Sequence, residues 1–301
     1  MTTVAAIDIG TNTTRLLVSR DGRDIARRAV ITRLGQGVAR TRRLEPVAIE
    51  RTLATLREYR EQIDQAGVTT MRVIATSACR DAANRDAFFD TAESALGVRP
   101  EMITGDEEGR LAFTGATRGF DRSRGPFCVI DIGGGSTEFV VGTDHVEGLR
   151  SVDIGSVRLT EAELRSDPPR AEELANALAI AGAHFDDVLL ALPSITEART
   201  VIGVAGTITT MAAIELGLAT YDRDRVHHFP LRRAAAEDVF RTLATERLAD
   251  RVHNPGLEAA RADVIVGGCC ILVAIMRRLG LREVVVSDAD LLDGVIAGLL
   301  N

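Results

Sequence analysis

A run of acidic, glycine and hydroxyl residues within positions 128–141 is the part of the sequence best suited to chemistry. Apolar residues flank it, and its central residues are Asp131, Gly133, Gly134, Gly135, Ser136, Thr137 and Glu138. Three consecutive glycines allow positive φ angles and let a ligand approach the backbone N–H groups directly. Amides that point into one concavity bind anions, most often phosphate. We therefore predict a strand, a glycine turn that cradles phosphate, and a second strand.

Two carboxylates flank this turn, Asp131 before it and Glu138 after it. Beside a bound phosphate they would repel the ligand unless a cation lay between them. Mg²⁺ binds one or two carboxylates together with waters and phosphate oxygens. The pattern therefore predicts a Mg²⁺ cofactor.

A similar pattern occurs near the N-terminus, where residues 5–18 align without a gap on residues 128–141. Asp8 then corresponds to Asp131, and Arg15 corresponds to Glu138. The turn between them consists of Gly10, Thr11, Asn12 and Thr13. One glycine turn could be an ordinary hairpin, but two aligned copies favour a duplicated domain with a ligand between the halves. An arginine in one copy and a carboxylate in the other suit a polyphosphate that is neutralised on one side and attacked beside a metal on the other.

The amino-acid composition and net charge of the chain exclude some classes of function. The chain has 301 residues, 46% of them hydrophobic, which indicates one large or two ordinary globular domains. The net charge of −7 argues against general nucleic-acid binding. All 36 basic residues are arginines, so no lysine is available for phosphate binding or a Schiff base. Phosphate must be held by arginines, backbone amides and metal.

The sequence also predicts a cytoplasmic protein that binds no membrane. The longest apolar runs, such as residues 264–276, contain glycines and are too short to span a bilayer, and the N-terminus lacks a secretory pattern. The four cysteines show no C-x-x-C spacing, which favours buried, reduced thiols.

Alternating strands and helices predict an α/β fold. We expect strands at 4–9, 14–20, 23–33, 71–75, 146–152 and 284–287, and helices at 46–65, 84–96, 170–192 and 290–300. The polar segment 118–126 is a candidate domain boundary. It gives a first domain of residues 1–122 with 288–301, and a second domain of residues 123–287.

Four charged residues outside the hairpins could contribute chemistry. Arg80 follows a predicted strand, where open α/β sheets bind ligands, although it could instead cap the next helix. Glu107 and Glu108 enter a predicted helix, where acids also favour the helix dipole. Hydrolysis of a phosphoanhydride needs a general base, and a glutamate beside a second acid could have a suitably raised pKa. Arg110 could orient either glutamate.

Three further segments are considered as functional candidates. Gly206 and Thr207 lie in a predicted strand–turn–helix, which could bind a nucleotide or polyphosphate or could be a plain connection. Residues 153–158 are predicted as a Gly/Ser turn. His227 and His228 are adjacent in a predicted strand and would point to opposite faces, so we expect no zinc site there.

Five sequence blocks carry a family resemblance. They begin at Asp8 (DIGTN), Thr76 (TSACR), Gly105 (GDEEGR), Asp131 (DIGGGSTE) and Arg261 (RADVI). In content and order they resemble the exopolyphosphatase/guanosine pentaphosphate phosphatase (Ppx/GppA) family, in a short two-domain form. The resemblance implies a duplicated actin-like (ribonuclease H-like) ATPase fold with an interdomain cleft.

The family implies a Mg²⁺-dependent hydrolysis of the terminal phosphate of inorganic polyphosphate. Glu108 would be the catalytic base, with Glu107 as the alternative, and Arg80 would bind phosphate. Asp8, Asp131 and Glu138 would hold the metal, some through water. Guanosine pentaphosphate, an intermediate of the stringent response, is the alternative substrate, and a non-catalytic sensor of alarmone or polyphosphate is the alternative class. A homodimer and a preference for shorter chains are further expectations from the resemblance.

Overall fold

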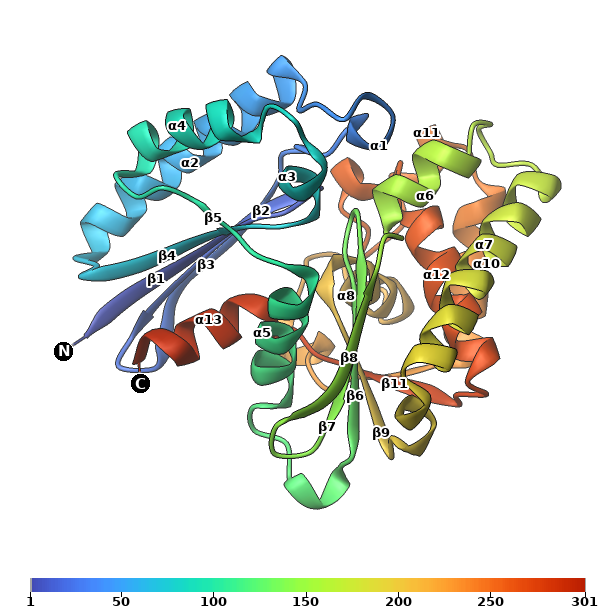
Figure 1. The fold of residues 1–301 in the computed structure, drawn as a ribbon. Helices are drawn as coiled ribbons and strands as arrows, with labels where there is room; N and C mark the ends of the chain where they lie inside the picture. Colours follow the sequence, from blue (N-terminus) through green and yellow to red (C-terminus); the bar gives the residue numbers. More distant parts are fainter. Residues whose placement is uncertain (1, 301) are drawn as a thin grey trace. The chain divides into compact units, whose positions relative to one another are not determined.

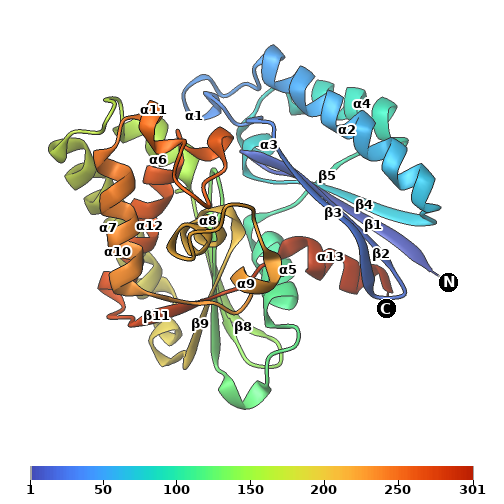
Figure 2. The same ribbon diagram turned by 180° about the vertical axis from the view of Figure 1, so that it is seen from behind.

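The computed structural model describes residues 2–300, and the chain divides into two compact units. Unit 1 comprises Met1–Gly115 with Leu291–Asn301, and unit 2 comprises Ala116–Asp290. The division falls inside helix α5 (Gly105–Thr117), whereas the sequence analysis placed it in the polar segment that follows this helix. Figures 1 and 2 show both units from opposite sides.

Unit 1 is built on a five-stranded mixed sheet. Its elements are β1 (Thr3–Ile9), β2 (Thr13–Arg20), β3 (Arg23–Ile31), α1 (Val38–Thr41), α2 (Pro46–Ala66), β4 (Thr70–Ala75), α3 (Ser77–Asp81), α4 (Arg85–Leu96), β5 (Glu101–Met102), α5 and α13 (Leu291–Leu300). The strand order is β3-β2-β1-β4-β5, with β1, β2 and β3 antiparallel and β1, β4 and β5 parallel.

The central strand β1 is buried on both faces of this sheet. Its side chains alternate in direction, so Ala5 and Ile7 pack in one hydrophobic cluster with residues of α2 and α4. Val4 and Ala6 pack in a second cluster with residues of α13. Helices therefore cover both faces, as Figure 1 shows. This explains why β1 is apolar at nearly every position rather than at alternate ones.

Unit 2 is built on a six-stranded mixed sheet. Its elements are η1 (Arg122–Arg124), β6 (Phe127–Ile132), β7 (Thr137–Gly142), β8 (Val146–Val152), α6 (Ser156–Glu163), α7 (Ala171–Ala191), η2 (Pro193–Glu197), β9 (Thr200–Val204), α8 (Ala205–Glu215), α9 (Arg223–Val226), β10 (Pro230–Arg232), α10 (Arg233–Thr245), α11 (Leu248–Arg251), η3 (Ala259–Arg261), α12 (Ile265–Arg278) and β11 (Glu283–Val286). The strand order is β10-β11-β9-β6-β7-β8.

The sheet of unit 2 repeats the pattern of unit 1. β6 pairs antiparallel with β7 and parallel with β9, as β1 pairs antiparallel with β2 and parallel with β4. β8 and β11 then take the places of β3 and β5. The two units are thus copies of one mixed α/β design, and the predicted duplicated actin-like fold is confirmed.

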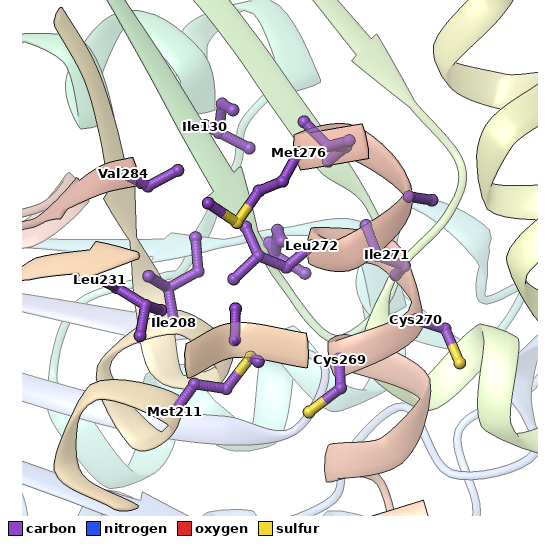
Figure 3. Close-up of a cluster of buried hydrophobic side chains, with 14 of the residues drawn as sticks. Ile130, Ile208, Met211, Leu231, Cys269, Cys270, Ile271, Leu272, Met276 and Val284 are labelled. Carbon is purple, nitrogen blue, oxygen red and sulfur yellow. The ribbon is translucent and has the colours of Figure 1, made fainter. Parts of the chain in front are cut away.

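The core of unit 2 is formed around α12. Leu272 and Met276 of this helix lie among side chains from the sheet and from α8 (Figure 3). Cys269 and Cys270 belong to the same cluster, and all four cysteines are buried free thiols, as predicted. Burial raises the pKa of Cys270 to about 12, so its thiol stays protonated at neutral pH.

Several local expectations are corrected. Residues 153–158 are not simply a turn, because α6 begins at Ser156. His227 and His228 lie in a turn after α9 rather than in a strand. Within residues 2–300, α7 is long and apolar enough to cross a membrane by length and composition alone, although the sequence analysis judged the apolar runs too short. Phe185 and Val188 of this helix pack in the core of unit 2.

Candidate active site

The hairpin of unit 1 closes tightly at residues 10–13. The Gly10 N–H donates to the Thr13 carbonyl at 3.1 Å. A Cβ atom at position 10 would lie 2.8 Å from that same carbonyl oxygen, so only glycine fits this turn. The register places Asp8 directly opposite Arg15 across the two strands.

The carbonyls of this turn point toward the segment that follows β3. The Thr11 carbonyl accepts from Gly35 N–H at 2.8 Å, and the Asn12 carbonyl accepts from the N–H groups of Thr32 and Arg33 at 3.0 and 2.9 Å. The turn is therefore held by its carbonyl side. Within residues 2–300, the backbone N–H groups of Thr11 and Asn12 have no acceptor.

Asn12 adds a side-chain donor to this turn. The residue is only 6% exposed, and its Nδ2 atom has no hydrogen-bond partner among residues 2–300. A buried donor without an acceptor costs about 1–3 kcal/mol. An anionic ligand at the turn would supply that acceptor, which fits the predicted phosphate-binding role of residues 10–13.

Asp8 and Arg15 form a buried ion pair in the hairpin of unit 1. Arg15 donates from Nε and Nη2 to Asp8 Oδ2 at 3.0 and 2.7 Å. The Asp8 side chain is 5% exposed and the Arg15 side chain 20%. The guanidinium thus neutralises the carboxylate at the base of the turn.

Glu108 lies in the same unit and is also buried. Arg80 Nη1 donates to Glu108 Oε2 at 2.7 Å and to the Ile103 carbonyl at 3.1 Å. Burial raises the pKa of Glu108, the positive charge of Arg80 opposes this rise, and the negative charge of Asp8 adds to it. Glu108 is therefore a carboxylate with increased proton affinity, which is the property that a general base needs.

Glu107 occupies a different environment from Glu108. It accepts from Arg72 Nη2 at 2.6 Å, and Arg72 also binds Glu101. The Glu107 side chain is 42% exposed. Arg110, expected to orient one of the glutamates, is exposed and contacts neither of them among the described residues, so that expectation is wrong.

The hairpin of unit 2 has the same closure and a different charge. The Gly133 N–H donates to the Ser136 carbonyl at 3.0 Å, and the register places Asp131 directly opposite Glu138. Both carboxylates are at least nine-tenths buried. Glu138 Oε1 accepts from Ser151 Oγ at 2.7 Å. Side chains in this register have Cβ atoms about 4.5–5.5 Å apart, so the two carboxylates can share one cation.

The start of α6 holds the glycine loop of unit 2. The Gly133 carbonyl accepts from Ser156 N–H at 2.9 Å, and the Gly134 carbonyl accepts from the following two N–H groups at 2.9 and 3.1 Å. Arg158 Nε donates to the Gly135 carbonyl at 2.9 Å. The loop is therefore held by its carbonyls, and within residues 2–300 the N–H groups of Gly134 and Gly135 have no acceptor.

Gly155 allows this close packing. A Cβ atom at position 155 would lie 2.5 Å from both Gly134 C and Gly135 N. The sequence analysis noted a Gly/Ser turn here but identified neither Gly155 nor Arg158 as a supporting residue. The local signal is a glycine followed three residues later by an arginine. Only the fold shows that both residues support the glycine loop.

Gly206 lies at the N-terminus of α8, against the guanidinium of Arg261. A Cβ atom at position 206 would lie 2.4 Å from Arg261 Nη1, so a larger residue there would displace the guanidinium. Arg261 also forms a long ion pair with Glu258 at 3.8 Å. Thr207 is buried and packs against Gly268 of α12. Gly206 is thus part of a cationic helix N-terminus, whereas the side chain of Thr207 contributes packing.

The donor set of unit 2 fits Mg²⁺. Among residues 2–300, no group of three His, Cys, Asp or Glu residues could form an all-protein metal cage. Mg²⁺ does not need one, because it binds one or two carboxylates and completes its shell with waters and phosphate oxygens. Asp131 and Glu138, beside the predicted phosphate-binding turn, are such a pair. Asp8, the third predicted ligand, lies in unit 1 with Arg15, and its metal role stays a prediction.

The two adjacent histidines form no metal site. The imidazoles of His227 and His228 stack with centroids 3.8 Å apart, and His227 Nδ1 accepts from the Asp288 backbone N–H at 3.1 Å. Burial lowers the pKa of His228. The prediction that no zinc binds here was argued from opposite faces of a strand, and that argument is wrong because the two imidazoles stack in a turn.

Comparison with known proteins finds relatives that cover nearly the whole chain. Exopolyphosphatase 2 of Mycobacterium tuberculosis is 38% identical over 316 residues, covering 99% of this chain and 99% of that protein. The guanosine-5'-triphosphate,3'-diphosphate pyrophosphatase of Aeromonas salmonicida is 32% identical, covering 99% of this chain but 59% of its own length. The crystal structure of an exopolyphosphatase-like protein superposes with a TM-score of 0.95 at 37% identity, covering 99% of this chain and 98% of that chain.

The sequence model of the Ppx/GppA phosphatase family matches residues 18–301. The chain belongs to the Ppx/GppA phosphatase family.

Proposed function

We propose that this protein is an exopolyphosphatase that hydrolyses the terminal phosphoanhydride bond of inorganic polyphosphate with Mg²⁺. The observation that carries the proposal is Glu108, a buried carboxylate with a raised pKa held by Arg80. A full-length relative that is named an exopolyphosphatase supports the choice of substrate.

The residues of each unit have separate tasks in this proposal. In unit 1, the amides of the turn at residues 10–13 and the Asn12 side chain bind phosphate oxygens, while Arg15 and Arg80 neutralise charge. In unit 2, the amides of Gly134 and Gly135 bind phosphate oxygens. Glu108 accepts a proton from water as the water oxygen bonds to the terminal phosphorus, and the bridging P–O bond breaks to release the shortened chain.

The metal would be held by Asp131 and Glu138, with Asp8 as a further ligand through water. When bound, Mg²⁺ neutralises the charge that develops on the phosphate oxygens. Removal of the metal with a chelator is expected to abolish phosphate release, and added Mg²⁺ is expected to restore it. Calorimetric titration of Mg²⁺ into Glu138→Gln measures the metal site independently of activity.

Guanosine pentaphosphate is the second candidate substrate. It is favoured by the pyrophosphatase relative and by the cationic N-terminus of α8, where Arg261 lies against Gly206. A non-catalytic sensor is the alternative class, and the presence of Glu108, Asp131 and Glu138 argues against it. Hydrolysis of guanosine pentaphosphate would connect the protein to the stringent response.

The decisive experiment measures phosphate release from polyphosphate, guanosine pentaphosphate and ATP in parallel. Glu108→Gln is expected to lower kcat on polyphosphate by about 10²–10⁴-fold, because it removes the proton acceptor. Glu107→Gln, the matched control, is expected to stay within about twofold because that side chain is partly exposed and paired with Arg72. Release from the pentaphosphate alone would favour the second candidate, and binding without any release would favour the sensor.

Two general properties complete the proposal. Four buried free thiols support a reducing, cytoplasmic location. A homodimer is proposed from the family resemblance, and sedimentation at several concentrations tests it.

A further inference from the structure

Three exposed arginines follow the third strand of unit 1, and we call them the arginine strip. They are Arg40, Arg42 and Arg43. We propose that the arginine strip binds the phosphates of a polyphosphate chain that lie beyond the terminal ones. This inference rests on the proposed function, since it names how the same substrate would be held farther along its length.

The segment that bears the strip begins at the phosphate-binding turn. Gly35 N–H donates to the Thr11 carbonyl, and Arg33 N–H donates to the Asn12 carbonyl. A Cβ atom at position 35 would lie 2.3 Å from Thr11 Cγ2, so the Gly35 backbone packs directly against the Thr11 side chain. The segment therefore packs against the carbonyl side of the turn, whereas the terminal phosphates would bind its amide side.

The other end of the segment lies beside α3, which carries Arg80. Ala83 N–H donates to the Arg42 carbonyl at 2.8 Å, and Arg42 Nη1 pairs with Asp81 at 3.2 Å. Leu44 N–H donates to Asn84 Oδ1 at 2.8 Å. The strip thus adjoins both phosphate-binding features of unit 1, the turn and the helix of Arg80.

The backbone of the strip is ordered by its own hydrogen bonds. Thr41 Oγ1 donates to the Gly37 carbonyl and accepts from Arg43 N–H. Gly37 and Arg42 adopt positive φ angles of 74° and 54° at the two ends of α1. Because the backbone is held in place, binding of a polyanion would cost mainly the ordering of the side chains.

The charges of the strip are available for a ligand. Among residues 2–300, Arg40 and Arg43 have no ion-pair partner. Arg42 pairs with Asp81, but its side chain is 63% exposed, so solvent weakens that pair. Each internal phosphate of polyphosphate carries one negative charge, and spaced arginines bind such a repeating anion without requiring a particular end group.

The test compares long-chain polyphosphate with tripolyphosphate as ligands for Arg40→Glu/Arg43→Glu. Fluorescence anisotropy with end-labelled polyphosphate is expected to show roughly ten- to a hundredfold weaker binding of the long chain. Competition by tripolyphosphate is expected to be unchanged within about twofold, because its phosphates occupy the terminal positions. The salt dependence of long-chain binding should also become shallower.

Two further variants serve as controls for the binding experiment. Arg57→Glu changes an exposed arginine on α2 that lies farther along the chain, and it should leave both affinities unchanged. Arg40→Gln/Arg43→Gln removes the charges without introducing new ones and is expected to weaken long-chain binding by a smaller factor. Equal losses for both ligands, or no loss for either, would overturn the proposal.

The inference and the proposed function can fail separately. Wild-type protein that binds long polyphosphate through the strip but releases no phosphate would refute the hydrolase and keep the strip. Wild-type protein that hydrolyses polyphosphate, with an unchanged preference between long and short chains in the double variant, would refute the strip alone. A wild-type protein that binds no long polyphosphate would overturn both.

Discussion

The hairpins of the two units share one backbone design. In each, the N–H group of the first glycine of the turn donates to the carbonyl three residues later. The N···O distance is 3.1 Å for Gly10 and 3.0 Å for Gly133. In each, the turn carbonyls are bound by another segment, residues 32–35 in unit 1 and residues 156–158 in unit 2. Both arrangements leave amide N–H groups for an anion.

One cross-strand position distinguishes the two hairpins. Arg15 faces Asp8 in unit 1, whereas Glu138 faces Asp131 in unit 2. The first pair is neutral overall and presents a guanidinium, and the second carries two negative charges and can bind phosphate only together with a cation. A single position thus separates a pair that presents a guanidinium from a pair of carboxylates suited to a cation.

Converting the unit 2 hairpin into the unit 1 type should have the largest effect. In Glu138→Arg, the new guanidinium would pair with Asp131 and displace the metal. Phosphate release is expected to fall by at least about 10³-fold, equivalent to roughly 4 kcal/mol, and Mg²⁺ binding in calorimetry should disappear. Glu147→Arg, an exposed change on β8, is the control. Retained Mg²⁺ affinity in Glu138→Arg would refute the metal assignment, and Glu138→Gln repeats the test if the arginine variant does not fold.

The second prediction compares the two glycines that support the turns. Gly155→Ala would place a Cβ 2.5 Å from backbone atoms of the unit 2 loop, whereas Gly35→Ala would meet a methyl group of Thr11. Since backbone yields less than a side chain, we expect Gly155→Ala to lower kcat/KM by about a hundredfold and Gly35→Ala by about tenfold. Gly298→Ala, with open space around it, is the control. Equal effects of the first two changes would contradict the assigned packing.

The third prediction concerns stability. Arg15→Met leaves the buried Asp8 without its cation and is expected to cost about 2–3 kcal/mol, or a fall in Tm on the order of 5 °C. Arg60→Met removes an exposed ion pair with Asp64 and should cost less than about 0.5 kcal/mol. Thermal unfolding of both variants, with Asp8→Asn/Arg15→Met as the repaired double variant, measures the difference. Similar losses for the two single variants would show that the Asp8–Arg15 pair is not specially desolvated.

The smallest expected effect is a shift in the pH profile. Burial raises the pKa of Glu108, and the base must be ionised, so kcat/KM should fall about tenfold per pH unit below that raised pKa. The acidic limb of the pH profile should therefore lie at a pH above the usual range of glutamate pKa values. Arg80→Met removes a cation that lowers this pKa and should move the limb to higher pH. Arg72→Met acts on Glu107 instead and should leave the limb in place.

The raised pKa of Glu108 also makes the stability of the fold depend on pH. Because the folded-state pKa of Glu108 lies above the unfolded value, its stabilising contribution is complete below the unfolded pKa and is lost as pH rises through the folded pKa. Glu108→Gln should therefore raise Tm relative to wild type at neutral pH and lose this advantage in acid. An advantage that grows toward acid pH would contradict the direction of the shift.

Much of the fold could be predicted from local sequence signals. Helix α2 ends where Gly67 takes a φ of 66°, and α4 ends where Gly97 takes a φ of 76°, close to the helix ends predicted at residues 65 and 96. The duplicated hairpins were visible because glycine turns and flanking carboxylates repeat in the sequence. Helix α6 was missed because its first N–H groups are satisfied by carbonyls of the glycine loop, a contact distant in sequence.

Arg251 illustrates a contribution without any local signal. It is 4% exposed, and its guanidinium donates to the carbonyls of Leu243, Ala262 and Glu246. Burial lowers its pKa. By binding the carbonyl next to Arg261, it helps to hold the segment that places Arg261 against Gly206. Only the fold distinguishes this arginine from the many exposed ones.

The sequence by itself determined the chemistry that is available, because residue types and turn geometry are local properties. It predicted two phosphate-binding turns and a carboxylate pair in unit 2, and it showed that the chain has no lysine. The tertiary structure decided which of two adjacent glutamates is buried, since neighbouring residues on a helix point about 100° apart and packing selects one face. It also decided that Arg15 neutralises Asp8 and that Arg80 holds Glu108, because these contacts join strands and helices that are far apart along the chain.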